Sequence, residues 1–142
     1  MQEFITNNPT ETIKVAEDLA GNLGPGQVIA LAGNLGAGKT VFVKALAQKL
    51  GIKETITSPT FVLLKVYNLD FNNIKTFVHV DCYRLDEAEN LADIGLQDYL
   101  EDSTALVIIE WADKLHNLPT NNLIKITIES QGGDKRKITI EN

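Results

Sequence analysis

Residues 33–40 read GNLGAGKT, and their types and spacing match a loop that binds phosphate. Glycines let the backbone turn at positive φ, so that successive N–H groups can surround one anion. A helix that starts after the loop points the positive end of its dipole at the same anion. Lys39 is then placed to reach the β- and γ-phosphates, and the Thr40 hydroxyl to bind Mg²⁺. The pattern Gly-x-x-x-x-Gly-Lys-Thr therefore predicts a P-loop that binds a nucleoside triphosphate with its metal ion.

The sequence on either side of this loop favours the same interpretation. QVIALA, residues 27–32, is a short apolar run that predicts a strand buried on both faces. From Lys39 to Gly51, apolar residues recur at helical spacing. Strand, loop and helix are therefore contiguous, which is the context that distinguishes a P-loop from an ordinary glycine-rich turn. We predict nucleotide binding by nine consecutive residues: Gly33, Asn34, Leu35, Gly36, Ala37, Gly38, Lys39, Thr40 and Val41.

Two carboxylates stand at the ends of other apolar runs. Asp81 ends IKTFVHVD, residues 74–81, and Glu110 ends ALVIIE, residues 105–110. A P-loop enzyme needs an acid at the end of a neighbouring strand to hold Mg²⁺ or to orient water. We predict that Asp81 and Glu110 are catalytic together with Lys39, and that both acids join Thr40 as metal ligands. Which acid contacts the metal directly stays open.

Further polar side chains surround Asp81. Strand alternation places His79 and Tyr83 on the same face as Asp81, and Arg84 follows directly. Each is a candidate auxiliary residue of the site. The alternative is structural: His79 and Tyr83 as core residues and Arg84 in an ion pair.

The motifs found elsewhere in the sequence favour one nucleotide and one reaction. The motifs by which switch proteins recognise guanine do not follow it, so ATP is favoured. Thr60, in the segment TSPTF, is a candidate switch residue that senses the γ-phosphate. Small-molecule kinases use several arginines in a lid, whereas this chain has only Arg84 and Arg136. Hydrolysis of ATP is the favoured reaction; a kinase, and a nucleotide-dependent regulatory subunit without turnover, stay as alternatives.

Composition limits the chain to one domain and a few environments. A length of 142 residues, 44% of them hydrophobic, suits one compact domain spanning residues 1–142. No apolar run of about 18 residues is available to cross a membrane, and the N-terminus lacks a secretory pattern, so we expect a cytoplasmic protein. Its one cysteine, Cys82, we expect to be a buried, unreactive thiol. The net charge of −6 argues against unaided binding to nucleic acid.

The remaining patterns predict an α/β fold. It is a single P-loop NTPase-like domain, a mixed β-sheet with flanking helices, whose buried parallel strands end at residues 32 and 110. Besides the elements already named, we predict a helix from Thr10 to Leu23, hairpins that pair 61–67 with 74–81 and 123–129 with 135–141, and short helices over 86–92 and 95–101.

Four motifs in this order, GNLGAGKT, TSPTF, HVDCYR and ALVIIEW, resemble the TsaE (YjeE) family of bacterial ATPases over nearly the whole chain. The resemblance implies a small P-loop domain that acts with two protein partners. These partners install threonylcarbamoyl on the adenosine beside the anticodon of certain tRNAs. It also implies that ATP hydrolysis, weak in the isolated protein, resets the complex, and that tRNA is contacted only indirectly.

The same resemblance implies roles for individual residues. Gly36, Gly38, Lys39 and Thr40 would bind phosphate and Mg²⁺, Asp81 and Glu110 would handle metal and water, and Thr60 would act as the switch. Trp111, the only tryptophan, is either core packing or a residue beside the nucleotide or a partner. Ala112-Asp113 follows it where some members carry proline, which puts the details of partner contact in doubt.

Overall fold

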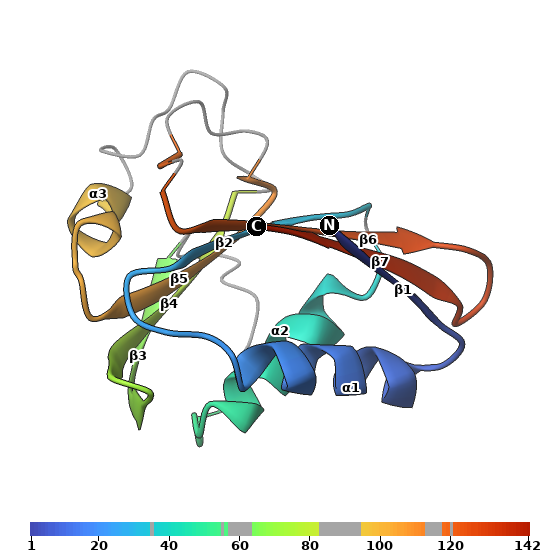
Figure 1. The fold of residues 1–142 in the computed structure, drawn as a ribbon, viewed down its shortest axis with the longest axis horizontal. Coiled ribbons are helices and arrows are strands. Elements are labelled where there is room, and N and C mark those ends of the chain that lie inside the picture. Colours follow the sequence, from blue (N-terminus) through green and yellow to red (C-terminus); the bar gives the residue numbers. More distant parts are fainter. Residues whose placement is uncertain (35, 55, 57–63, 83–94, 113–117, 120) are drawn as a thin grey trace.

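In the part of the chain that the structure describes, seven strands form one mixed sheet in the order β1-β7-β6-β2-β5-β4-β3 (Figure 1). The computed structural model describes residues 1–34, 36–54, 56, 64–82, 95–112, 118–119 and 121–142. The strands are β1 (Gln2–Thr6), β2 (Val28–Ala32), β3 (Leu64–Phe71), β4 (Ile74–Asp81), β5 (Ala105–Glu110), β6 (Leu123–Ser130) and β7 (Arg136–Glu141). The helices in these residues are α1 (Pro9–Ala20), α2 (Lys39–Lys49) and α3 (Leu96–Leu100).

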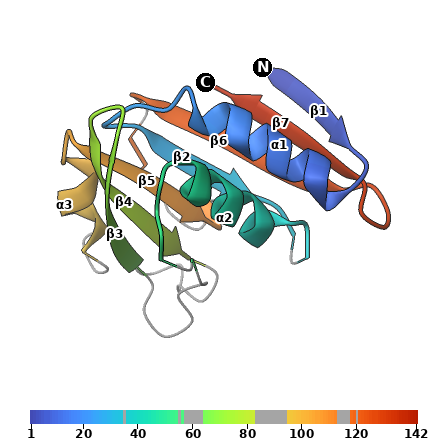
Figure 2. The same cartoon turned by 90° about the horizontal axis from the view of Figure 1, so that it is seen from below.

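The middle of the sheet is parallel, because β2 pairs in parallel with both β5 and β6, and β4 pairs in parallel with β5. All six residues of β5 are buried, as its unbroken apolar sequence predicts. Helices α1 and α2 lie side by side across one face of the sheet, as Figure 2 shows. On the opposite face, Leu96 of α3 packs with Val28 and Val107. The predicted α/β architecture, a mixed sheet with flanking helices, is confirmed.

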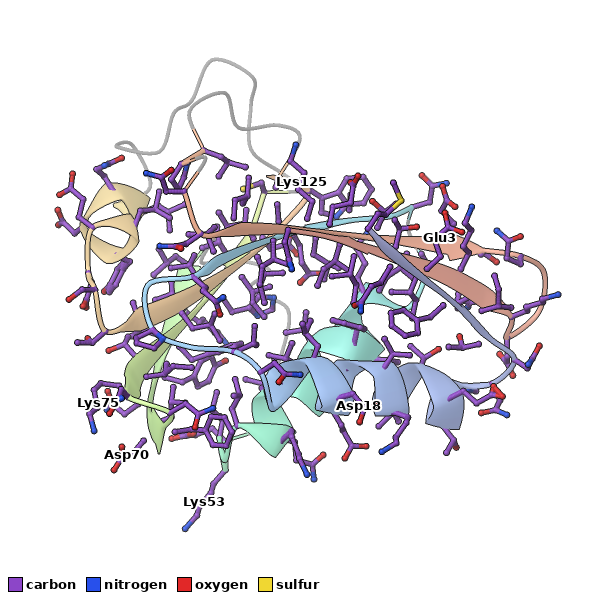
Figure 3. The ribbon with its side chains drawn as sticks, in the orientation of Figure 1. Glu3, Asp18, Lys53, Asp70, Lys75 and Lys125 are labelled. Carbon is purple, nitrogen blue, oxygen red and sulfur yellow. The ribbon has the colours of Figure 1, made fainter. Side chains whose placement is uncertain are left out.

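Strand alternation divides the core between the two faces. Ile29 and Ile108 pack with Phe42 on the face of the sheet covered by α1 and α2, whereas their sequence neighbours lie on the face that carries α3. Figure 3 shows side chains filling the layer between the sheet and the two helices, whereas Lys53 points away from this layer. On the outer hairpin, Lys75 and Asp70 form an exposed ion pair at 2.7 Å.

Both predicted hairpins are present, β3–β4 and β6–β7, and their strands are antiparallel. The strand predicted over 61–67 continues to Phe71, because the chain turns only at Asn72 and Asn73, which have positive φ; residues 61–63 lie outside the described residues. The helix predicted up to Leu23 ends earlier, at Ala20, and Leu23 is buried in the turn that follows. Its N-terminus is capped by the Asn8 side chain, which accepts a hydrogen bond from the Glu11 N–H at 2.9 Å. The short helix expected over 95–101 is α3. The helix predicted over 86–92 lies outside the described residues.

Strand β1 was not predicted from the sequence. It pairs antiparallel with β7, placing Phe4 opposite Ile138 at the edge of the sheet. Within the described part of the chain, no helix has the length and apolar character needed to cross a membrane.

Gly33 follows β2 and begins the GNLGAGKT segment, residues 33–40, which we call the phosphate loop. Only glycine suits this position. Its φ is 156°, and a Cβ atom there would lie 2.6 Å from the carbonyl oxygen of Ile128 on β6. We expect Gly33→Ala to lower the free energy of unfolding by about 2 kcal/mol, because both backbone strain and this contact oppose the methyl group. Urea denaturation measures the change. Gly24→Ala is the matched control, since a Cβ at Gly24 meets no atom of the described residues within 4 Å. Equal stability of the two variants would contradict the prediction.

Candidate functional site

The GNLGAGKT segment forms the connection between the carboxyl end of β2 and the amino end of α2. Gly36 and Gly38 have positive φ angles of 78° and 102°. Gly38 is the N-cap of α2, and no side chain of the described residues caps the first N–H groups of the helix. These amides are therefore available to an anion, and the helix dipole adds to the attraction. Leu35 lies outside the described residues.

The side chains of Lys39, Thr40 and Val41 differ in burial. Lys39 is only 7% exposed, whereas Thr40 and Val41 are exposed on the first turn of α2. The Lys39 ammonium donates hydrogen bonds to the carbonyl oxygens of Gly33 and, at 3.3 Å, Asn34. It also lies 3.9 Å from the centroid of the Trp111 ring. The cation is thus located between the start of the loop and the end of β5.

The two candidate acids lie at the same edge of the sheet as the loop. Asp81 is paired directly with Glu110 across β4 and β5, and Glu110 is also opposite Leu31 of β2. The pairing continues past the strand ends, because the Cys82 N–H donates to Glu110 O at 3.0 Å and the Trp111 N–H to Leu31 O at 3.2 Å. The parallel register therefore brings both acids beside the end of the loop strand.

His79 is buried and contacts one of these acids. Its Nε2 lies 2.6 Å from Oε2 of Glu110, and the two residues are only 2% and 3% exposed. Its Nδ1 has no hydrogen-bond partner among the described residues. The bond restricts the rotamers of both side chains in the layer beneath α2. His79 is thus both a core residue and a neighbour of the candidate acid.

Trp111 adopts a backbone conformation that is rare for a large residue, with φ at 58°. It follows β5 directly and is half-buried, packing against the core on the α3 face. The distance of its ring from the Lys39 ammonium is that of a cation–π contact. Trp111 therefore contributes to the core and also contacts Lys39 of the phosphate loop.

Arg136 is a contact of the loop that the sequence did not predict. It begins β7, and its guanidinium donates to Ala37 O at 2.7 Å and to Gly36 O at 3.2 Å. The partners are 99 and 100 residues apart in the chain. No local pattern indicates such a contact; the only signal was that the chain has just two arginines.

The described residues fit a metal ion that arrives with a nucleotide. They contain no group of three or more histidine, cysteine or acidic side chains arranged as a metal site of its own. Mg²⁺ commonly uses one or two protein oxygen ligands together with substrate phosphates and water. The Thr40 hydroxyl and the carboxylates of Asp81 and Glu110 are ligands of that kind. Thr60, Tyr83 and Arg84 lie outside the described residues, so their roles stay predictions.

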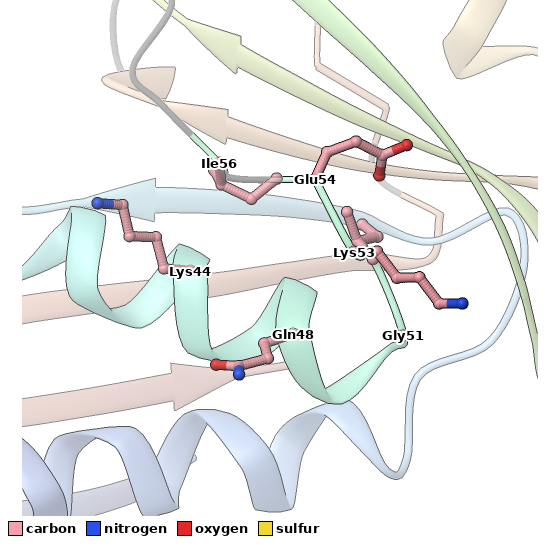
Figure 4. A pocket seen from close by; sticks show the side chains of 7 residues that line it. Lys44, Gln48, Gly51, Lys53, Glu54 and Ile56 are labelled. Atoms are coloured by element: carbon pink, nitrogen blue, oxygen red, sulfur yellow. The ribbon is translucent and has the colours of Figure 1, made fainter.

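A separate pocket of about 550 Å³ lies at the carboxyl end of α2 (Figure 4). Lys44, Gln48 and Glu54 line it together with apolar side chains. Burial and, secondarily, the negative charge of Glu54 raise the pKa of Tyr67 on β3 above that of an ordinary phenol. None of the lining residues belongs to the phosphate loop or to the strand ends that carry the acids.

Comparison with known proteins assigns the family. The sequence profile described as "Threonylcarbamoyl adenosine biosynthesis protein TsaE" matches residues 6–138. The chain is 38% identical over 135 residues to the tRNA threonylcarbamoyladenosine biosynthesis protein TsaE of Bacillus subtilis, covering 94% of this chain and 81% of that protein. It is 41% identical over 118 residues to the protein of the same name from Treponema pallidum, covering 83% of this chain and 84% of that one.

A solved structure supports the same assignment. The crystal structure of Bacillus subtilis YdiB has a TM-score of 0.75 and 33% sequence identity, covering 98% of this chain and 83% of that one. The resemblance identified from four motifs is thus confirmed over most of the chain, well beyond the phosphate loop. This chain belongs to the TsaE family.

Proposed function

We propose that this protein binds ATP with Mg²⁺ at residues 33–41 and hydrolyses it within an assembly that attaches threonylcarbamoyl to tRNA. The observation that supports this most is the convergence of four features at one edge of the sheet. They are the phosphate loop, the uncapped start of α2, and the two acids Asp81 and Glu110 at neighbouring strand ends. The names of the relatives supply the pathway, the biosynthesis of threonylcarbamoyladenosine in tRNA.

Different residues of the site bind the phosphates, hold the metal ion and position water. The amides of the loop and of the first turn of α2 hold the phosphates, and the Lys39 ammonium moves from the Gly33 and Asn34 carbonyls to the β- and γ-phosphates. The Thr40 hydroxyl and the Asp81 carboxylate hold Mg²⁺, which neutralises charge on the phosphates. Glu110, whose orientation is fixed by His79, positions the attacking water.

Hydrolysis of ATP drives a change in a protein assembly. The protein acts as a single domain in the cytoplasm with two protein partners, and it meets tRNA through them. The net charge of −6 supports the indirect contact, because a tRNA backbone attracts positively charged surfaces. We expect hydrolysis to be slow until a partner orders or completes the site.

Lys39→Ala should abolish ATP hydrolysis and weaken binding of ATP with Mg²⁺, because it removes the main positive charge directed at the β- and γ-phosphates. Calorimetry and phosphate release measure the two effects. Lys44→Ala is the matched control, since Lys44 is an exposed lysine of the same helix. Wild-type affinity and turnover in Lys39→Ala would refute the assignment of the loop.

Glu110→Gln and Asp81→Asn should retain nucleotide binding and lower kcat by about 100-fold, because each keeps the shape of the site and loses a charge used in the reaction. Single-turnover and steady-state hydrolysis in the assembled complex test this. Glu129→Gln on β6 removes an exposed carboxylate and should leave kcat unchanged. A variant of either acid that turns over at the wild-type rate would show that the acid is structural.

The isolated protein should hydrolyse ATP slowly, bind tRNA weakly at physiological salt, and be stimulated by the two partners. The measurements are phosphate release with and without the partners and a filter-binding titration with tRNA. The decisive assay is restoration of multiple-turnover tRNA threonylcarbamoylation by the purified chain. Submicromolar tRNA binding, or full turnover without partners, would favour an autonomous enzyme. Transfer of phosphate to a metabolite in an acceptor panel would favour a kinase.

A further inference from the structure

The guanidinium of Arg136 reaches from the far end of the chain to the outer side of the phosphate loop. Its Nε donates to Ala37 O at 2.7 Å, and its Nη2 donates to Gly36 O at 3.2 Å. The two acceptors are the carbonyls of successive peptide groups. One rigid, planar side chain therefore restrains two neighbouring peptides of the loop.

The other end of the same side chain is held by the turn between β6 and β7. Nη1 donates to the carbonyl oxygens of Gly133 at 2.6 Å and Lys135 at 3.0 Å, and it lies 3.5 Å from Ser130 Oγ. The backbone of Arg136 is paired on both sides, with Thr6 of β1 and Ser130 of β6. The guanidinium is thus held by the β6–β7 turn on one side and by the phosphate loop on the other.

The restrained peptides are the ones most able to rotate. Ala37 stands between two glycines, Gly36 and Gly38, both at positive φ. In a planar trans peptide the carbonyl and the N–H point in opposite directions, so fixing Ala37 O also fixes the direction of the Gly38 N–H. Rotation of this peptide would exchange a donor for an oxygen on the phosphate side, and an oxygen repels an anion.

We propose that Arg136 is a positioning residue that keeps the phosphate loop in its binding conformation by holding the carbonyls of Gly36 and Ala37. This inference rests on the proposed binding of ATP at the loop. Arg136 acts through the backbone and through its forked geometry, so its positive charge alone does not suffice. A lysine keeps the charge but cannot hold two carbonyls and the turn in one plane.

The first test compares Arg136→Lys and Arg136→Gln with the matched control Lys137→Gln. Lys137 is the next residue of β7, and the ion pair of its ammonium with Glu3, at 3.9 Å, lies at the β1 edge. Calorimetry with ATPγS and Mg²⁺ should show about tenfold weaker binding for both Arg136 variants and less than a twofold change for Lys137→Gln. Wild-type affinity of Arg136→Lys would overturn the inference, because a charge alone would then be enough.

The second test needs no nucleotide. In protein labelled with ¹⁵N-glycine, the amide signals of Gly36 and Gly38 should shift or broaden in Arg136→Lys, whereas those of Gly24 and Gly51 stay in place. The melting temperature of each variant separates this local effect from loss of the fold. If the wild-type protein binds no nucleotide, the proposed function fails, and the glycine signals still show whether Arg136 holds the loop. Unchanged signals of Gly36 and Gly38 in Arg136→Lys would overturn the inference.

Discussion

Parallel pairing of β2 with its two neighbours is the constraint on which the site depends. It places Leu31 opposite Glu110, and the pairing of β5 with β4 places Glu110 opposite Asp81. A slip of one residue in either register would turn an acid to the other face of the sheet, because side chains alternate along a strand. Because all six residues of β5 are buried, such a slip would also disrupt the packing of its side chains on both faces of the sheet.

Much of this arrangement could be predicted from the sequence, because its causes are local. Apolar runs indicated β2 and β5, helical spacing indicated α1 and α2, and the glycine pattern indicated the loop between β2 and α2. The relations that escaped prediction join distant segments. The edge strand β1 is short and depends on β7, and the contacts of Arg136 with the loop and of His79 with Glu110 arise only when the sheet forms.

Several residues of the site adopt conformations or environments that lower the stability of the fold. Trp111 has a left-handed backbone, a conformation that costs of order 1 kcal/mol for a large residue. Glu110 and His79 are polar and almost fully buried, and their mutual hydrogen bond offsets only part of the loss of hydration. Sequences depart from such local rules mainly where function requires it, which agrees with the position of these residues beside the phosphate loop.

The contact between Trp111 and Lys39 would allow nucleotide binding to be followed by tryptophan fluorescence. The chain has one tryptophan, and its ring lies 3.9 Å from the Lys39 ammonium, which moves to the phosphates in the proposed function. Removing a cation from the face of an indole changes the electric field across the ring and hence the energy of its emission. Intrinsic fluorescence would therefore follow the occupancy of the loop in real time, without a label and without background from a second indole.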